Sequence, residues 1–505
     1  MPAKPAISSG SPPSPEKMES PIPWLIRWLS GCLMLIGFLK LGTPIILQDQ
    51  IQLPQGLLEW IFLPWPLSVG FAVLMLWSAA ILWHLKARSS RRSPLLLIPL
   101  CWFALQCAAS INSLDQELSW LMLKHFLPLI ALFMGGYFFL SKDPGLGTLS
   151  GYALAGMVLC LWTATEQRMG GLEATRELIY QEPYWQQTYP EDFLQKALED
   201  PAWLQSIRRD PSLLQEAVEE FHLSSGLLSS SEQPPFLERD LGFLEKIGKD
   251  RVFGTLFYPN ALASGILLCL PWATLTVWQL SHRLQIPSRY LLSSCFCLWG
   301  LICLGWSGSK GGWLVGMMSA SLLMLVSAIR LKLKLGLTCM LLALAGGAFA
   351  WKYADYFNQG ATSLSARITY WEAAWDNSLA HPLLGSGPGT FLRVFSQVKS
   401  EDAEMARLTH NDYLQQASDS GWPSALVYLA WIGLPLLVTR PRNGLSERPV
   451  QTAVWLGLCG WALQNFIEFG LYIPGLAWPF FLLLGWLWGT HQAWQETSSP
   501  QKDGV

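Results

Sequence analysis

Charged side chains are scarce in this chain. Asp, Glu, Lys and Arg make up 14% of its 505 residues, whereas a soluble domain usually contains about 25%. Basic residues are not in excess either, because 34 Lys and Arg stand against 36 Asp and Glu and the formal net charge is -2. Binding to nucleic acid normally requires a basic stripe or patch. The composition therefore predicts a protein without a nucleic-acid partner.

Cysteine is absent from the long polar loops. All 10 cysteines lie within apolar runs, where a thiol most often serves as a small packing side chain. The polar loops therefore offer no residues for disulfides. No CxxC pair stands with histidine in the spacing of a zinc or iron–sulfur site. The cysteines are Cys32, Cys101, Cys107, Cys160, Cys269, Cys295, Cys297, Cys303, Cys339 and Cys459.

Long apolar runs, by contrast, dominate the sequence. Hydrophobic residues make up 51% of the chain, the mean hydropathy is +0.29, and there are 27 Trp, a residue that favours the membrane–water interface. Because a helix needs about 20 apolar residues to cross the bilayer core, the pattern predicts an all-α polytopic membrane protein with about 12 transmembrane helices. We place the spans at 24–46, 61–85, 94–111, 119–140, 148–165, 258–280, 289–307, 311–329, 334–351, 423–439, 450–469 and 471–490.

Basic residues in the connections between these spans indicate the topology. Alternate connections carry Lys or Arg, whereas 47–60 and 112–118 carry only acidic residues. Since basic connections stay in the cytoplasm, both termini are expected to be cytoplasmic. The long loops 166–257 and 352–422 then face the periplasm or the cell exterior. Lys310 is the basic residue that departs from this pattern.

The spans and loops divide the chain into segments. The N-terminal stretch is rich in Pro and Ser, and we expect it to be disordered. In the first long loop, Asp200-Pro201 and Asp210-Pro211 can each cap and begin a short helix. The expected organisation is a cytoplasmic tail at 1–23, membrane helices at 24–165, an extracytoplasmic helical domain at 166–257, membrane helices at 258–351, an extracytoplasmic catalytic loop at 352–422, membrane helices at 423–490 and a cytoplasmic tail at 491–505.

Polar motifs concentrate in the second long loop. Ser363 could cap a helix that runs to Leu379. Arg367 and Tyr370 would lie on the first turns of this helix, beside an apolar stripe. The stripe would consist of Ile368, Trp371, Trp375 and Leu379.

Three further features follow in the same loop. The glycine-rich run 385–389 either binds an anion through its N–H groups or forms a plain tight turn. The acidic run 401–404 is interpreted as a solvated helix face rather than a metal site. Thr409 or Asn411 would cap a helix that leads into the next span. His410 would then lie beside the helix N-terminus, where the dipole favours a neutral imidazole that can accept a proton.

Several motifs of the second half of the chain stand in a recognisable order. They are Arg251–Thr255, Pro259–Ala263, Ser309–Gly312, Arg367 with Tyr370-Trp371, His381–Phe391, His410-Asn411 with Gly421, and Phe469–Pro474. Together they resemble the O-antigen ligase/polymerase superfamily of bacterial cell-surface glycan assembly, which also includes proteins labelled as bicarbonate transporters. Lys310, Ser424 and Glu468 depart from the pattern, because relatives often have Arg, Gly and Asp there.

The resemblance implies a glycosyltransferase-C-like enzyme in the bacterial inner membrane. Such an enzyme transfers a glycan from a polyprenyl-diphosphate carrier to a hydroxyl of a glycan, lipid or protein acceptor, outside the cytoplasm. It implies an inverting reaction without a metal or any other cofactor, in keeping with the absence of a P-loop or Rossmann motif. His410 is implied as the general base and Arg367 as a catalytic residue that binds the donor diphosphate, together with Arg251 and Lys310. Possible supporting residues are Asn411, Tyr370, His125 and Lys124.

Other functions stay open at this point. A bicarbonate-type solute transporter would show ionisable or broken-helix sites near the bilayer midplane, often in an inverted repeat, and neither is evident. A non-catalytic component of a glycan-export complex would not need a histidine beside an arginine-rich rim. Lys124 and His125, inside the fourth span, either belong to a functional cavity or form a polar pair satisfied within the bundle. Ligase, polymerase and protein O-glycosyltransferase stay open as alternatives that differ in their acceptor.

Overall fold

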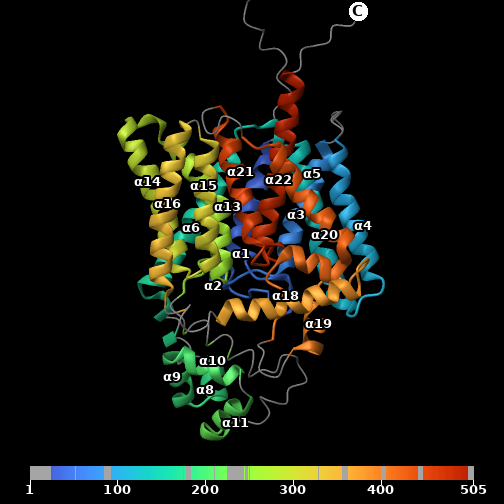
Figure 1. The fold of residues 1–505 in the computed structure, drawn as a ribbon, viewed down its shortest axis with the longest axis vertical. Coiled ribbons are helices and arrows are strands. Elements are labelled where there is room, and N and C mark those ends of the chain that lie inside the picture. Colours follow the sequence, from blue (N-terminus) through green and yellow to red (C-terminus); the bar gives the residue numbers. More distant parts are fainter. Residues whose placement is uncertain are drawn as a thin grey trace, which may run out of the picture.

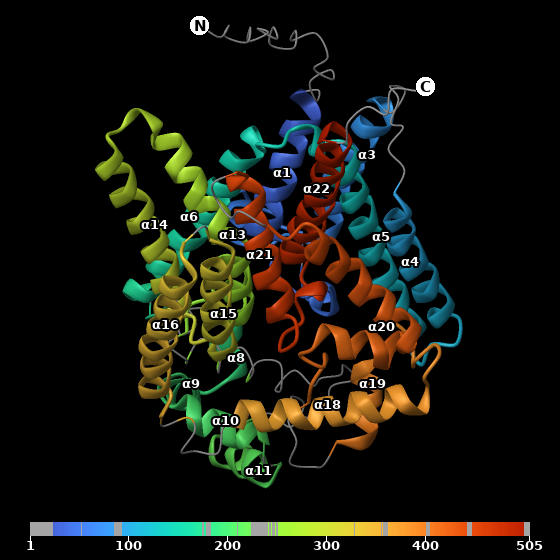
Figure 2. The same ribbon diagram turned by 45° about the horizontal axis from the view of Figure 1, so that its top comes forward.

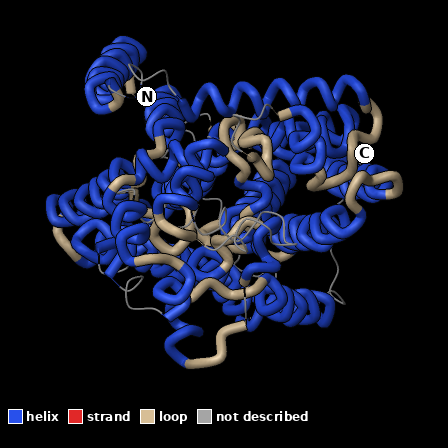
Figure 3. Tube along the Cα trace, turned by 90° about the horizontal axis from the view of Figure 1, so that it is seen from below, coloured by secondary structure: helices blue, strands red, loops and turns tan. Residues whose placement is uncertain are grey.

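The computed structural model of this chain is helical, and its described part contains no β-strand (Figure 3). The described residues are 24–51, 53–84, 93–173, 176–177, 183–209, 211–223, 241, 244, 248, 251–327, 329–354, 356, 362–399, 405–441 and 447–498. The expected disordered tail at 1–23 and the acidic run 401–404 lie outside these residues.

A helix occupies each of the predicted spans (Figure 1). These helices are α1 (Trp24–Lys40), α3 (Leu67–His84), α4 (Leu97–Ser110), α5 (Gln116–Phe138), α6 (Gly147–Glu166), α13 (Pro259–Leu280), α14 (Ile286–Trp306), α15 (Lys310–Val326), α16 (Leu331–Lys352), α20 (Asp412–Val438), α21 (Pro449–Gln464) and α22 (Pro474–Ser498). In the described part, 6 helical segments are long and apolar enough to cross a bilayer. The protein is therefore a polytopic membrane protein, and the number of spans stays a prediction.

The tenth predicted span continues a polar helical segment. Helix α20 begins at Asp412, directly after the predicted cap at Asn411, and Gly421 interrupts it with φ 78° and ψ 165° just before the predicted start of the span at 423. The part before Gly421 is polar, with Gln415 and Asp419, so its sequence does not suggest a membrane helix. These side chains are nevertheless buried, because they bond to one another and to neighbouring backbone.

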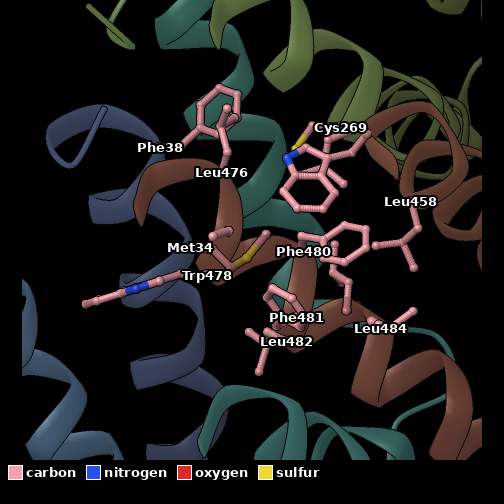
Figure 4. Packing of buried hydrophobic residues seen from close by; sticks show 14 of the residues in the cluster. Met34, Phe38, Cys269, Leu458, Leu476, Trp478, Phe480, Phe481, Leu482 and Leu484 are labelled. Atoms are coloured by element: carbon pink, nitrogen blue, oxygen red, sulfur yellow. The ribbon is translucent and has the colours of Figure 1, made fainter. Parts of the chain in front are cut away.

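Two central helices, α5 and α22, pack closely because glycines remove side chains from their contact. A Cβ atom added at Gly136 would lie 2.1 Å from the carbonyl oxygen of Leu482, and one at Gly485 would lie 2.0 Å from that of Phe133. Figure 4 shows the apolar side chains of α22, such as Trp478 and Phe481, among residues of α1, α13 and α21. This core fixes the helix ends between which the polar site forms.

Four short helices gather beyond one end of the membrane helices (Figure 1). They are α8 (Pro183–Thr188), α9 (Glu191–Glu199), α10 (Pro201–Arg209) and α11 (Pro211–Glu220). They enclose an apolar cluster of their own that includes Tyr189, Phe193 and Leu204. The predicted cap at Asp200 is confirmed, since its Oδ1 accepts a hydrogen bond from the N–H of Trp203 at 2.9 Å. Asp210 lies outside the described residues.

The second long segment between membrane helices contains α18 (Thr362–Ala380) and α19 (Phe391–Val398). Helix α18 runs across the ends of the membrane helices in both views (Figures 1 and 2). The predicted cap at Ser363 is wrong, because the helix already begins at Thr362. The predicted apolar stripe exists but is not core, since Ile368 and Trp375 are 44% and 48% exposed. The opposite side of α18, with Tyr370, packs against Phe395 of α19.

Candidate functional site

The site is organised around Glu468, in the short connection between α21 and η8 (Gly470–Tyr472). Its carboxylate is buried and accepts hydrogen bonds from Nη2 of Arg367 at 2.5 Å and from Nδ2 of Asn260 at 2.7 Å. Its second oxygen lies 3.4 Å from Nδ1 of His410. Burial by itself would raise the pKa of Glu468, but the charge of Arg367, the contact with His410 and the charge of Arg251 lower it overall. Glu468 is therefore held as a carboxylate.

His410 projects from a strained residue between α19 and α20. Its φ of 53° falls in the left-handed region, which a residue with a Cβ adopts at a cost and which is enriched at functional sites. The imidazole is enclosed by two aromatic rings, with Phe469 at 4.7 Å in an edge-on arrangement and Tyr370 at 6.2 Å in a stacked one. The backbone turn and the two rings together fix which side of the imidazole meets Glu468.

Asn411 holds the start of α20 immediately after His410. Its side-chain oxygen accepts a hydrogen bond from the N–H of Leu414 at 3.0 Å, so the predicted helix cap is confirmed for Asn411. Thr409, the other candidate, is not the cap, because its hydroxyl donates to the carbonyl oxygen of Asn411 at 2.9 Å. Asn411 thus contributes through backbone geometry that positions His410.

Arg251 reaches the same carboxylate through Asn260. Its Nη2 donates to Oδ1 of Asn260 at 3.0 Å, and its Nε donates to the carbonyl oxygen of Ser307 at 2.8 Å. Burial lowers the pKa of Arg251, and the nearby Tyr258 and Glu468 counteract this effect. Arg251 and Arg367 thus flank Glu468 on two sides, one directly and the other through an amide.

Lys310 lies at the beginning of α15, on the side of the site where Arg251 is. Its ammonium group lies 3.9 Å from the ring centre of Tyr356 and 5.3 Å from that of Tyr353, within range of cation–π attraction. Burial raises the pKa of Tyr353, and the neighbouring charge of Arg251 opposes that rise. Tyr353 therefore links the surroundings of Lys310 and Arg251, whereas Arg367 approaches Glu468 from α18.

The structure separates Lys124 from His125. Lys124 is exposed on the outside of α5, so it does not join the site. His125 is fully buried, and its Nε2 lies 2.8 Å from the carbonyl oxygen of Leu471, three residues after Glu468 in the sequence. Of the two, only His125 reaches the loop that carries Glu468.

The glycine-rich turn 385–389 is built as a packed turn. The N–H groups of Gly387 and Gly389 donate to the carbonyl and to Oδ2 of Asp419, at 2.8 and 2.9 Å. Glycine is required at these positions, because Gly387 and Gly389 have φ of 114° and 79°. With those N–H groups already bonded to α20, the plain-turn interpretation fits better than an anion site.

Sequence reasoning did not select Asn260, Asp412 or Glu468 as site residues. Glu468 attracted notice only as an acidic residue where relatives often have Asp, and Asn260 only as part of a helix-entry motif. Asn260 and Glu468 share one signal, a polar side chain near the end of an apolar stretch, whereas Asp412 stands in a polar run. Their partners, however, lie 101 and 208 residues away in sequence, which no local pattern reveals.

A comparison with protein families bears on this geometry. Residues 295–429 match the family model described as O-antigen ligase. This segment is an O-antigen ligase domain. It includes Lys310, Arg367 and His410, whereas Arg251, Asn260 and Glu468 lie outside the matched residues. No curated protein matches the chain.

The O-antigen ligase match confirms the family resemblance seen in the motifs. The match supports, in broad terms, a glycan function of the ligase or polymerase type in a membrane protein, and the family suggests a lipid-linked glycan as substrate. Within the ligase domain, α18 supplies Arg367 and the start of α20 follows His410. The remaining members of the site lie outside the matched segment, with Arg251 and Asn260 before it and Glu468 after it.

Proposed function

We propose that this protein is a glycosyltransferase of the O-antigen ligase type. It transfers a glycan from a polyprenyl-diphosphate carrier to an acceptor hydroxyl outside the cytoplasm. One observation carries the proposal: Arg367 and His410, both in the ligase domain, meet at the buried carboxylate of Glu468. A cationic group for a leaving diphosphate and a base for a hydroxyl thus lie on opposite sides of one anchoring residue.

His410 acts as the general base in this proposal. Its Nδ1 faces Glu468, which leaves Nε2 to take the proton of the acceptor hydroxyl. The acceptor oxygen then forms a bond to the anomeric carbon of the donor. The bond between that carbon and the diphosphate oxygen breaks, and its electron pair leaves with the lipid diphosphate. Because attack and departure take place on opposite faces, the anomeric configuration inverts.

Arg367 binds the departing diphosphate. A guanidinium has five N–H donors in a planar fork that matches phosphate oxygens. Within the described residues, Nη2 of Arg367 is the one of these donors that bonds to a carboxylate, that of Glu468. Arg251 and Lys310, at outer ends of membrane segments, supply further positive charge. Because side chains provide these charges, the reaction proceeds without a metal ion.

The proposal places the enzyme in a bacterial inner membrane with both termini in the cytoplasm. In this orientation α18, α19 and the site face outward, at the membrane surface where a lipid diphosphate lies. The carrier lipid stays in the bilayer, and the acceptor approaches from the aqueous side.

The test is transfer from a polyprenyl-diphosphate-linked glycan by purified protein carrying His410→Ala or Arg367→Ala. A general base contributes about 10²–10⁴-fold in rate, so His410→Ala should lower kcat by that order while the donor KM stays similar. Arg367→Ala should also raise the donor KM, and Arg367→Lys should not restore it, because an ammonium lacks the planar fork.

Matched controls lie in the same domain. His381→Ala removes an exposed histidine at the end of α18, and Arg393→Ala removes an exposed arginine that pairs with Asp115. Both should transfer normally. Near-normal transfer by His410→Ala would remove it as the base. Bicarbonate uptake by vesicles that contain the wild-type protein, without glycan transfer, would favour the transporter alternative.

A further inference from the structure

The connection that carries Glu468 is tied to the start of α20 at two points by one residue, Asp412. The backbone N–H of Asp412 donates to the carbonyl of Asn465 at 2.9 Å. Its side-chain Oδ2 accepts a hydrogen bond from the N–H of Leu471 at 2.8 Å. Asn465 and Leu471 lie on either side of Glu468 in sequence, and Asp412 is fully buried. Asp412 therefore closes the segment 465–471 into a loop against α20.

His125 provides a second tie to the same loop from α5. Its ring Nε2 lies 2.8 Å from the carbonyl oxygen of Leu471, and both residues are fully buried. The N–H and the carbonyl of Leu471 are thus bound by side chains from two different helices. Helix α5 is itself fixed against α22 by the glycine contacts, so His125 connects the loop to the rigid centre of the bundle.

The loop has little room to adopt another shape. A Cβ atom added at Gly470 would lie 2.5 Å from Oδ1 of Asn465 and 2.9 Å from Nε1 of Trp461. Phe469, inside the loop, packs against His410 at 4.7 Å. Since Asp412 is two residues after His410, one side chain sets how the base and the Glu468 loop lie relative to each other.

We propose that Asp412 and His125 are positioning residues that hold Glu468 and Phe469 against His410. This inference rests on the proposed function for its effect on catalysis, but the tie itself does not. Neither residue contacts the substrate, because both are buried behind the loop. An acceptor hydroxyl must lie close to the base for efficient proton transfer, and a displacement of about 1 Å can cost about 10²-fold in rate.

The hydrogen bonds, rather than the charge of Asp412, perform this role. Oδ2 of Asp412 accepts from Leu471, whereas Oδ1 has no hydrogen-bond partner within the described residues. An asparagine can offer its carbonyl oxygen to Leu471 in the same way. A glutamine at position 125 can donate its Nε2 hydrogen to the carbonyl of Leu471. Asp412→Asn and His125→Gln should therefore keep the tie that Asp412→Ala and His125→Leu remove.

The first measurement is hydrogen–deuterium exchange of the purified full chain, followed in peptides that cover 466–473. Loss of a buried hydrogen bond should speed exchange there by ~10-fold in Asp412→Ala and in His125→Leu. The conservative variants should exchange like the wild type. Asp419→Ala is the matched control, because this buried acid of α20 bonds to Gly389 instead, so it should loosen 385–391 and leave 466–473 unchanged.

The second measurement is transfer kinetics at matched membrane levels. Asp412→Ala and His125→Leu should lower kcat by ~10- to 100-fold with the donor KM changed much less. Each effect should nearly vanish in a Glu468→Ala background, because residues that act through one another are not additive. A purely structural loss would reduce the amount of active protein equally in both backgrounds.

The outcomes separate the two proposals. If Asp412→Ala and His125→Leu exchange faster at 466–473 but the wild type transfers no glycan, the tie is retained and the proposed function is overturned. Two results would overturn the tie. One is normal transfer by the wild type together with losses of Asp412→Ala and His125→Leu that add fully to the loss caused by Glu468→Ala. The other is unchanged exchange at 466–473 in Asp412→Ala. Asp412→Asn as impaired as Asp412→Ala would show that charge is required and refute the hydrogen-bond argument. If Asp412→Ala does not accumulate in membranes, the comparison of His125→Leu with His125→Gln tests the tie by itself.

Discussion

Replacing Glu468 with glutamine tests the centre of the site most directly. Glutamine preserves size and keeps one oxygen that can accept hydrogen bonds, but it removes the negative charge that pairs with Arg367 at 2.5 Å. The side chains of Glu468 and Arg367 are 5% and 17% exposed, so water does not replace the lost interaction fully. Removing a charged hydrogen-bond partner in such surroundings costs ~1–3 kcal/mol.

The expected effect on catalysis is smaller than the loss of the base. Glu468 orients the imidazole through Nδ1 but does not touch the acceptor proton. We expect Glu468→Gln to lower kcat by ~10- to 100-fold. This loss is smaller than the loss of the base itself, which contributes about 10²–10⁴-fold in rate. Glu468→Asp shortens the side chain and should fall between glutamine and the wild type. Glu372→Gln, at an exposed carboxylate of α18, is the control.

The dependence of stability on pH gives an independent assay. The pKa of Glu468 is lowered in the folded protein, so the ionised form stabilises the fold above the unfolded pKa of glutamate, about 4.3. This contribution is lost as the pH falls through the lowered folded pKa. The wild type should therefore melt at a higher temperature than Glu468→Gln at neutral pH, and the difference should shrink under acid conditions. Equal melting temperatures at pH 7, or a difference that is independent of pH, would refute the ion-pair reasoning.

Further predictions concern metal dependence, topology and packing. Transfer by the purified protein should persist in EDTA, because arginine and lysine side chains supply the positive charge; activity lost in EDTA and restored by Mg²⁺ or Mn²⁺ would contradict this. In a cysteine-depleted background, cysteines at the exposed positions Gln186 and Gln397 should react with an impermeant reagent from outside, and one at Ser89 should not; the reverse pattern would overturn the orientation. Gly485→Ala should destabilise the bundle or prevent its accumulation, because the new Cβ would lie 2.0 Å from the carbonyl oxygen of Phe133; a normal melting temperature would show that the α5–α22 contact can open.

Much of the fold followed from the sequence because the bilayer imposes simple demands. A segment without water must satisfy its backbone internally, so apolar runs become helices, and each predicted span contains one. The caps at Asp200 and Asn411 were also readable, because a cap depends on a side chain and an N–H two or three residues later. The burial of the first turns of α20 was not readable, since these turns are polar and become buried only against other parts of the chain.

The site divides in the same way. His410 and Arg367 stand in motifs that can be recognised along the chain, and the motifs indicate a base and a phosphate-binding cation. The sequence does not reveal that they share Glu468, because the three residues come from separate segments and meet only when α18, α20 and α21 pack together. Lys124 and His125 also show that proximity in sequence does not decide which residues join a site. They are neighbours in sequence, but successive residues of a helix point about 100° apart, so packing alone buries one and leaves the other exposed.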